Sequence, residues 1–260
     1  MDIGWCARLD QADRVREIGF DYVEVALGPM RLEDDAGFEA AQIAVRHATL
    51  PLPVFSQFLP LGMQVVGPDV DRPRVLRYLQ RAAHVLHAAG AHVVVFGSGW
   101  ARHVPAGWSR HDAGRQFIEM LSWCADALAG TGVTVAIESQ NRKETNFITT
   151  LAEAAAIAGQ VDRPGVQVMT DTYHLHEEAE SLDVVSASID RIVHVHLSDS
   201  DRQIPGRGGY DFDRFFDCLK ARGYRGRLSI EMMRAVTDDE MRTCLEFVRT
   251  RWDRAGGLTS

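Results

Sequence analysis

The segment VTVAIE (residues 133–138) is the first of four short apolar runs that each end in a polar side chain. The other three are VQVMTD (166–171), IVHVH (192–196) and LSIE (228–231). Their last residues are Glu138, Asp171, His196 and Glu231. These positions are 33, 25 and 35 residues apart, about one strand, one helix and two loops each time. That period predicts a TIM barrel, an α/β fold with eight strands and eight helices, whose chemistry lies at the C-terminal ends of its strands.

The rest of the chain alternates strand-like and helix-like segments in the same way, which favours parallel βαβ units. We expect strands at residues 2–6, 21–26, 45–49 or 52–56, 92–97, 133–138, 166–171, 192–197 and 227–232. The third strand has two candidate positions because Pro51, Pro53 and Pro60 interrupt this region. We expect helices at 71–91, 109–132, 150–160, 211–224 and 237–254. The length of 260 residues suits one barrel domain spanning residues 1–260.

Charge and cysteine usage limit the classes of partner. The net charge of −8 and the pI near 5.7 argue against nucleic acid or an anionic membrane surface as a partner. The four cysteines are far apart and form no CxxC pair, which is typical of reduced thiols in a cytosolic protein. We find no signal-peptide pattern and no run of about 18 apolar residues, so a cytoplasmic location without a membrane partner is expected.

Three carboxylates and one imidazole are the ligands of a hard divalent cation. Oxygen-rich ligation favours Mn²⁺, Mg²⁺ or Co²⁺ over a zinc site built on thiolates, and we expect Mn²⁺ first. Of the two histidines in IVHVH, we expect only one to face the site. His196 is preferred because it lies nearer the C-terminal end of its strand, and His194 is expected to pack against the outer helices.

Longer motifs around these residues resemble a known family. They are ESQNRKE (138–144), TDTYH (170–174), HVHLSDSDRQIPGRGGYDF (194–212) and SIEMM (229–233). Together they resemble the xylose-isomerase-like sugar isomerase/epimerase family, in its ketose 3-epimerase (D-tagatose 3-epimerase-like) branch. The resemblance runs from about residue 130 to residue 235 at the level of motifs, and the N-terminal half agrees mainly in the order of strands and helices.

The resemblance implies a set of roles at the matching positions. It implies metal ligation by Glu138, Asp171, His196 and Glu231, and substrate contacts from Glu144, His174 and Arg202. Glu138 and Glu231 would be the catalytic acid and base. They would move a proton next to the carbonyl of a ketose or keto-sugar derivative, through a metal-stabilised enediolate. The resemblance also implies a homodimer or homotetramer.

Two connections are long enough to form walls of the substrate pocket: residues 51–70 and 97–109. Both follow the C-terminal ends of expected strands and carry aromatic side chains. The run FGSGWARHVPAGW (96–108) could instead bind phosphate through Arg102 and His103, but we favour a wall over a neutral sugar.

Four alternatives remain open at this point. A single base could move the proton between adjacent carbons, which would give aldose–ketose isomerisation in place of epimerisation. A lyase could use the same proton abstraction on a 3-keto-glycoside and then expel the aglycone by β-elimination. A metal-dependent endonuclease shares the barrel, but it would need more histidine ligands and basic loops facing DNA, which the net charge of −8 disfavours. A sugar-binding barrel without activity is disfavoured because all seven matched positions carry reactive side chains.

Overall fold

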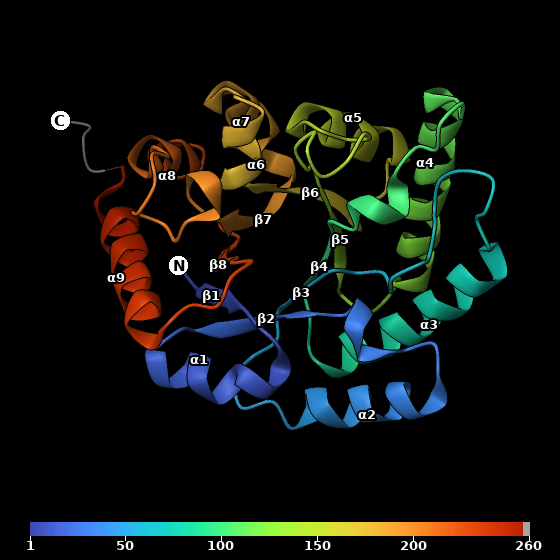
Figure 1. Ribbon diagram of the computed structural model, residues 1–260, viewed down its shortest axis with the longest axis horizontal. Coiled ribbons are helices and arrows are strands. Elements are labelled where there is room, and N and C mark those ends of the chain that lie inside the picture. Colours follow the sequence, from blue (N-terminus) through green and yellow to red (C-terminus); the bar gives the residue numbers. More distant parts are fainter. Residues whose placement is uncertain (257–260) are drawn as a thin grey trace.

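The computed structural model describes residues 1–256, and its strands close into one parallel barrel (Figure 1). The strands are β1 (Ile3–Cys6), β2 (Tyr22–Ala26), β3 (Val54–Ser56), β4 (Val93–Phe96), β5 (Thr134–Glu138), β6 (Val166–Asp171), β7 (Ile192–Leu197) and β8 (Arg227–Ile230). Each strand pairs with the next in sequence, and β8 closes the barrel on β1. This confirms the predicted TIM barrel.

Helices surround the barrel as an outer ring (Figure 1). They are α1 (Ala12–Ile18), α2 (Asp35–Arg46), α3 (Arg72–Ala88), α4 (Arg110–Ala127), α5 (Leu151–Val161), α6 (Thr172–Glu177), α7 (Leu182–Ser188), α8 (Phe212–Ala221) and α9 (Asp238–Arg254). The five expected helices correspond to α3, α4, α5, α8 and α9. Each of these five begins after an Asp, Ser or Thr whose side chain accepts a backbone N–H of the first turn. No described helix has the length and apolar character needed to cross a lipid bilayer.

The third strand lies at the second of its two candidate positions. It is only three residues long, and the carbonyl of Pro53 just before it accepts hydrogen bonds from the N–H groups of His92 and Val93 (2.7 and 3.1 Å). The first candidate, residues 45–49, instead covers the end of α2 and the loop that follows. Proline cannot donate to the ladder but its carbonyl can accept, so the strand starts directly after Pro53.

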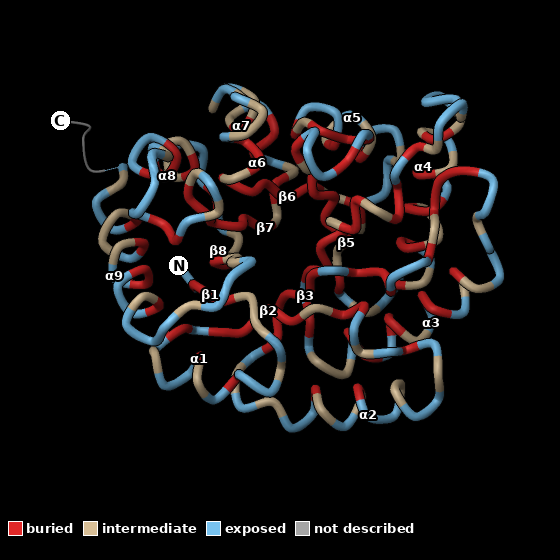
Figure 2. The backbone as a smooth tube through the Cα atoms, in the orientation of Figure 1, coloured by how far each residue is buried: buried red, intermediate tan, exposed pale blue. Residues whose placement is uncertain are grey.

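The buried apolar side chains of the strands form two separate clusters, one on each side of the barrel wall. A large cluster fills the space between the barrel and the helices, and a small one lies inside the barrel. The inner cluster consists of Tyr22, Val54, Val93, Val95, Ala136 and Met169. Figure 2 shows buried residues along the strands and exposed ones on the outer turns of the helices.

Polar residues replace this inner apolar layer one step further along the strands. Because side chains two residues apart share a face of a strand, Glu138 lies above Ala136 and Asp171 above Met169. Both acidic side chains are buried, at 4% and 1% exposure. The interior is therefore apolar near the N-terminal ends of the strands and polar near the C-terminal ends, where the site lies.

Candidate metal centre and active site

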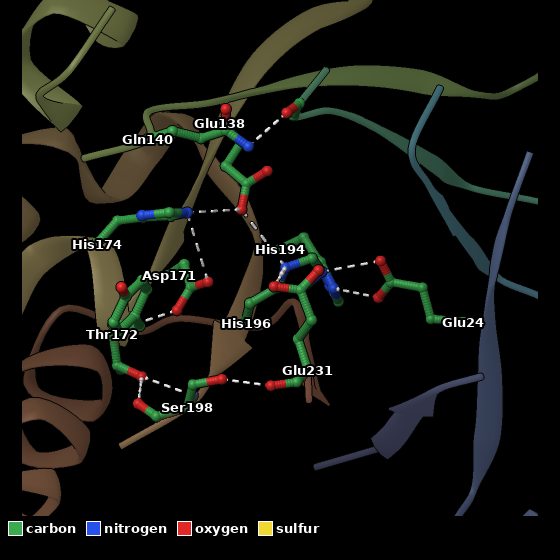
Figure 3. A network of polar contacts seen from close by, with 12 residues as sticks. Glu24, Glu138, Gln140, Asp171, Thr172, His174, His194, His196, Ser198 and Glu231 are labelled. Carbon is green, nitrogen blue, oxygen red and sulfur yellow. Dashed lines mark hydrogen bonds and ion pairs between the residues drawn. The ribbon is translucent and has the colours of Figure 1, made fainter. Parts of the chain in front are cut away.

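The four predicted metal ligands lie together at the C-terminal end of the barrel (Figure 3). Glu138, Asp171, His196 and Glu231 each offer one atom, and these atoms all lie within 4.8 Å of one another. The Nδ1 atom of His196 is 3.6 Å from Oε1 of Glu138 and 3.8 Å from Oε2 of Glu231. The ligands come from β5, β6, β7 and the residue just after β8, so one site gathers the ends of four strands.

The electrostatics of this cluster fit a cation. Oδ2 of Asp171 and Nδ1 of His196 are buried and have no hydrogen-bond partner in the described part of the chain. Burial raises the pKa of the Glu231 carboxyl, and the charges of Glu138 and Asp171 raise it further. Buried polar atoms are rarely left without a partner, and crowded carboxylates repel one another. A hard divalent ion would bind the unpartnered atoms and would also neutralise the repulsion between the carboxylates.

Glu24 and His194 form a buried support for the predicted ligand His196, and the position of His194 differs from the one expected. Nε2 of His194 lies 2.9 Å from one Glu24 oxygen, and Nε2 of His196 lies 2.8 Å from the other. All three side chains have no exposed surface. His194 therefore points into the barrel and does not pack against the outer helices, because side chains two residues apart on a strand share a face.

This support sets which nitrogen of His196 faces the cluster. With Nε2–H donated to Glu24, Nδ1 is the atom left to face the carboxylates. Burial alone would lower the pKa of the His196 imidazole, but Glu24 and Glu231 outweigh it and raise that pKa well above its usual value. Burial would likewise raise the pKa of Glu24, and the two imidazoles hold it well below its usual range.

Cys6 forms a second cluster with Glu24 and His196, but this cluster suits a metal less well. Burial raises the pKa of the Cys6 thiol well above its usual value, and the charge of Glu24 raises it further. A thiol must lose its proton to bind a metal, and both oxygens of Glu24 already accept hydrogen bonds. The cluster of the four predicted ligands is therefore the better candidate for a metal site.

His174 presents a hydrogen-bond donor beside this cluster. Its Nδ1 accepts the backbone N–H of Asn141 (3.1 Å), which leaves the proton on Nε2. That Nε2 is buried and unpartnered among the described residues, 3.9 Å from Oε1 of Glu138 and from Oδ2 of Asp171. Asn141 lies within the ESQNRKE motif, but its part in orienting His174 depends on a contact between the loop after β5 and helix α6 that the sequence does not reveal.

Arg202 connects the predicted substrate residues to the metal cluster. Its guanidinium donates to Oε2 of Glu231 (2.8 Å) and to Oε1 of Glu144 (3.0 Å), and it lies 3.7 Å from Oδ2 of Asp171. The same group lies over the ring of Tyr173, 4.2 Å from its centroid. All three predicted substrate residues, Glu144, His174 and Arg202, line one cleft with Glu138 and Glu231.

The buried carboxylate of Asp199 holds the loop that carries Arg202. Its Oδ1 accepts the N–H groups of Ser200 (2.8 Å) and Tyr210 (2.9 Å), and its Oδ2 accepts that of Gly206 (2.9 Å). Arg202 itself has φ +54°, a left-handed conformation that is uncommon outside glycine. A Cβ on Gly208 would lie 2.4 Å from the Asp199 carboxylate, so this position requires glycine.

The cleft above the metal cluster has a volume of about 340 Å³. The two long loops, 51–70 and 97–109, line it through Ser56, Gln57, Leu61 and residues 97–100. A Cβ on Gly97 would lie 1.7 Å from Oε2 of Glu138, so glycine lets this wall approach the carboxylate.

Arg102 is fully buried and donates to the carbonyls of Phe96 (2.8 Å) and Glu138 (2.6 Å). Arg102 therefore braces the wall and does not reach into the cleft to bind a phosphate.

Comparisons with known proteins agree with this geometry. A family model described as "Xylose isomerase-like TIM barrel" matches residues 12–251. The L-ribulose 3-epimerase of Methylomonas sp. (strain DH-1) is 29% identical over 249 residues, which cover 92% of this chain and 84% of the relative. The 3-dehydro-D-guloside 4-epimerase of Escherichia coli (strain K12) is 27% identical, covering 86% of each chain. A crystal structure of D-allulose 3-epimerase from Methylomonas sp. superposes with a TM-score of 0.81 at 25% identity, covering 96% of this chain and 98% of that one.

Proposed function

The chain belongs to the xylose isomerase-like TIM barrel family, and from its site we propose that it is a divalent-metal-dependent epimerase of keto sugars. It would invert a carbon next to a carbonyl group by removing a proton and returning one to the opposite face. The observation that carries this proposal is that two carboxylates, Glu138 at the end of β5 and Glu231 just after β8, meet in one candidate cation site.

The relatives support an isomerase over a lyase. The similar proteins reported above carry the names of sugar epimerases, and epimerases are isomerases. This confirms the predicted class of enzyme and favours it over β-elimination. The relatives act, by their names, on L-ribulose, D-allulose and a 3-dehydro-guloside, so the substrate class that we propose is a ketose or a keto-sugar derivative.

We assign a role in this reaction to the five charged or ionisable side chains that line the cleft. A bound divalent cation would supply electrostatic stabilisation of negative charge on the substrate oxygens. Glu138 and Glu231 would approach the reacting carbon from two sides, so that one removes the proton and the other returns it. Nε2–H of His174 would donate to a substrate oxygen, and the guanidinium of Arg202 would balance the charge that develops there. Glu144 would help to position the sugar and Arg202.

Proton exchange tests this proposal directly. The metal-stripped protein, with and without added Mn²⁺, would be incubated in D₂O with ketopentoses, ketohexoses and 3-keto-glucosides. We expect deuterium to enter beside the carbonyl only when metal is present, with an epimer as the product. Release of an aglycone in place of an epimer would indicate the lyase, and a metal-loaded protein that exchanges no proton with any of these sugars would refute the proposal.

Three finer points complete the proposal. Mn²⁺ is the ion that we expect, with Mg²⁺ or Co²⁺ as alternatives, because oxygen donors outnumber the single imidazole. We also propose a homodimer or homotetramer and a cytoplasmic location. Metal analysis of the purified protein and light scattering would test the first two of these points.

A further inference from the structure

A second hollow continues from the cleft of the metal cluster, and the proposed reaction does not use it. We call the cleft of about 340 Å³ the metal compartment and this second hollow, of about 390 Å³, the outer compartment. Both are lined by Gln57, Leu61 and Trp100, so they adjoin one another. The outer compartment also touches the 3-10 turn Gly28–Met30, which follows β2. Its walls therefore follow β2, β3 and β4 on the face of the barrel that carries the metal cluster.

The charges of the outer compartment are already paired. Arg31 forms an ion pair with Asp34 (3.0 Å), and the carboxylate of Glu33 accepts two hydrogen bonds from Arg74 (2.6 and 2.8 Å). A charged ligand group would find no uncompensated partner there and would lose its hydration. The compartment therefore favours a neutral group.

The junction between the compartments offers apolar surface and a free amide. Leu61 is 84% exposed at this point, although leucine is more often buried in a folded protein. The indole of Trp100 lines both hollows and offers a flat face of the kind that sugar and aryl rings contact. The side chain of Gln57 lines both hollows and makes no hydrogen bond to the described residues, and its φ of +42° is uncommon for a residue other than glycine.

We propose that the outer compartment binds a neutral substituent of the substrate, so that the preferred substrate is a keto-glycoside and not a free ketose. This inference rests on the proposed function. The keto sugar would lie in the metal compartment, and its glycosidic substituent would pass between Leu61 and Trp100. The glycosidic bond stays intact, because epimerisation breaks and remakes only a C–H bond. A free ketose would leave the outer compartment filled with water.

Matched glycosides would test the compartment. Binding and kcat/KM of the Mn²⁺-loaded protein would be compared for the methyl and the phenyl β-glycosides of 3-keto-glucose. We expect the phenyl glycoside to bind at least tenfold more tightly and to react with a correspondingly higher kcat/KM. A 4-carboxyphenyl glycoside should lose most of this advantage, because the compartment holds no unpaired cation for it.

Variants would show where the preference originates. Leu61→Asp and Trp100→Ala should bring the ratio of phenyl to methyl affinity close to one, and Trp100→Phe should restore most of it. Ile43→Ala truncates a side chain on α2 that is also exposed (51%) and lies outside both compartments, so it should keep the full ratio.

The outcomes separate this inference from the proposed function. Equal affinity for both glycosides, or a phenyl preference that survives Leu61→Asp and Trp100→Ala, would overturn the inference. Proton exchange with free ketoses would then still support the epimerase. A third outcome is that these variants abolish the phenyl preference while the protein exchanges protons with no keto sugar. It would support binding of the substituent in the outer compartment and would refute the epimerase.

Discussion

Glu24 is the buried residue that holds His196, one of the four proposed metal ligands. It lies behind His196 and contacts no other predicted metal ligand in the described hydrogen-bond network. Its two oxygens accept from two imidazoles, so each ring is held with Nδ1 free of that contact. Outer-shell partners of this kind fix the orientation and basicity of a metal-binding histidine.

The variant Glu24→Gln tests this support. The amide offers one acceptor in place of two and adds a donor that would face an imidazole N–H, so one ring must turn or change tautomer. We expect Mn²⁺ affinity to fall by roughly 10- to 100-fold, measured by calorimetric titration. Tyr22→Phe is the matched control, because it removes another buried hydrogen bond of β2, from Tyr22 to the carbonyl of Leu228 (2.8 Å). An unchanged Mn²⁺ affinity in Glu24→Gln would show that Glu24 only fills space.

The two proposed catalytic carboxylates allow a second test at this scale. Glu138→Gln and Glu231→Gln keep the side-chain shape but remove the ability to accept a proton. We expect each to lower kcat by roughly 10²- to 10⁴-fold, as is typical for the loss of a general acid or base. The fold should persist, because both residues lie in a crowded negative cluster and not in the apolar layers. Glu246→Gln on α9 makes the same chemical change on the surface, and metal content would be measured in all three variants. Normal turnover in either active-site variant would exclude the mechanism with two carboxylates.

At the scale of elements, the loop between β7 and α8 positions the only arginine that contacts the metal cluster within the described ion pairs. The loop has little regular secondary structure. Its backbone is held by the carboxylate of Asp199, which accepts hydrogen bonds from the N–H groups of Ser200, Gly206 and Tyr210. Rigid support of this kind keeps a loop residue in its working geometry.

We therefore expect Asp199→Ala to resemble Arg202→Ala in its kinetics. Each should raise KM and lower kcat/KM by about tenfold or more, and the double variant should lose little beyond either single one, because residues in one network are not additive. The loss of buried partners should also cost about 1–3 kcal/mol of stability. Asp211→Ala is the control, because it removes the N-terminal cap of α8 in the same loop and should cost stability of about 1 kcal/mol without changing KM. Additive losses from Asp199→Ala and Arg202→Ala would mean that the two residues act separately.

At the scale of the whole molecule, metal binding should stabilise the barrel. The cluster joins the ends of β5 to β8, and these ends are far apart in the unfolded chain, so a cation binds the folded state alone. At a free concentration 100 times Kd, the expected gain is about 2.7 kcal/mol, which corresponds to a rise in Tm of roughly 5–10 °C. Thermal melts with Mn²⁺ and with a chelator would measure this rise. Asp171→Asn should abolish it and the surface variant Asp253→Asn should keep it, whereas a Tm that is independent of metal would contradict the proposed centre.

Much of this arrangement follows from the sequence alone. The alternation of short apolar segments and helices indicates parallel strands that are buried on both faces, and the regular spacing over 260 residues favours a closed barrel. The polar residue at the end of each run predicts the cluster of possible metal ligands, because the strand ends of a barrel converge on one face. Both inferences depend only on local pattern and spacing, and so Glu138, Asp171, His196 and Glu231 could be located in advance.

The supporting contacts were decided only by the tertiary structure. Glu24 meets His196 from 172 positions away in the chain, and Asn141, in the loop after β5, meets His174 on helix α6. Arg102 was a possible phosphate contact in a run for which we favoured a pocket wall, and the structure buries it against backbone carbonyls. The third strand begins only after Pro53. Closing the barrel brings together side chains from strands that are not neighbours in the sheet, and no local pattern encodes such a meeting. The sequence thus determined which residues could bind the cation, and three-dimensional packing decided how each of them is held.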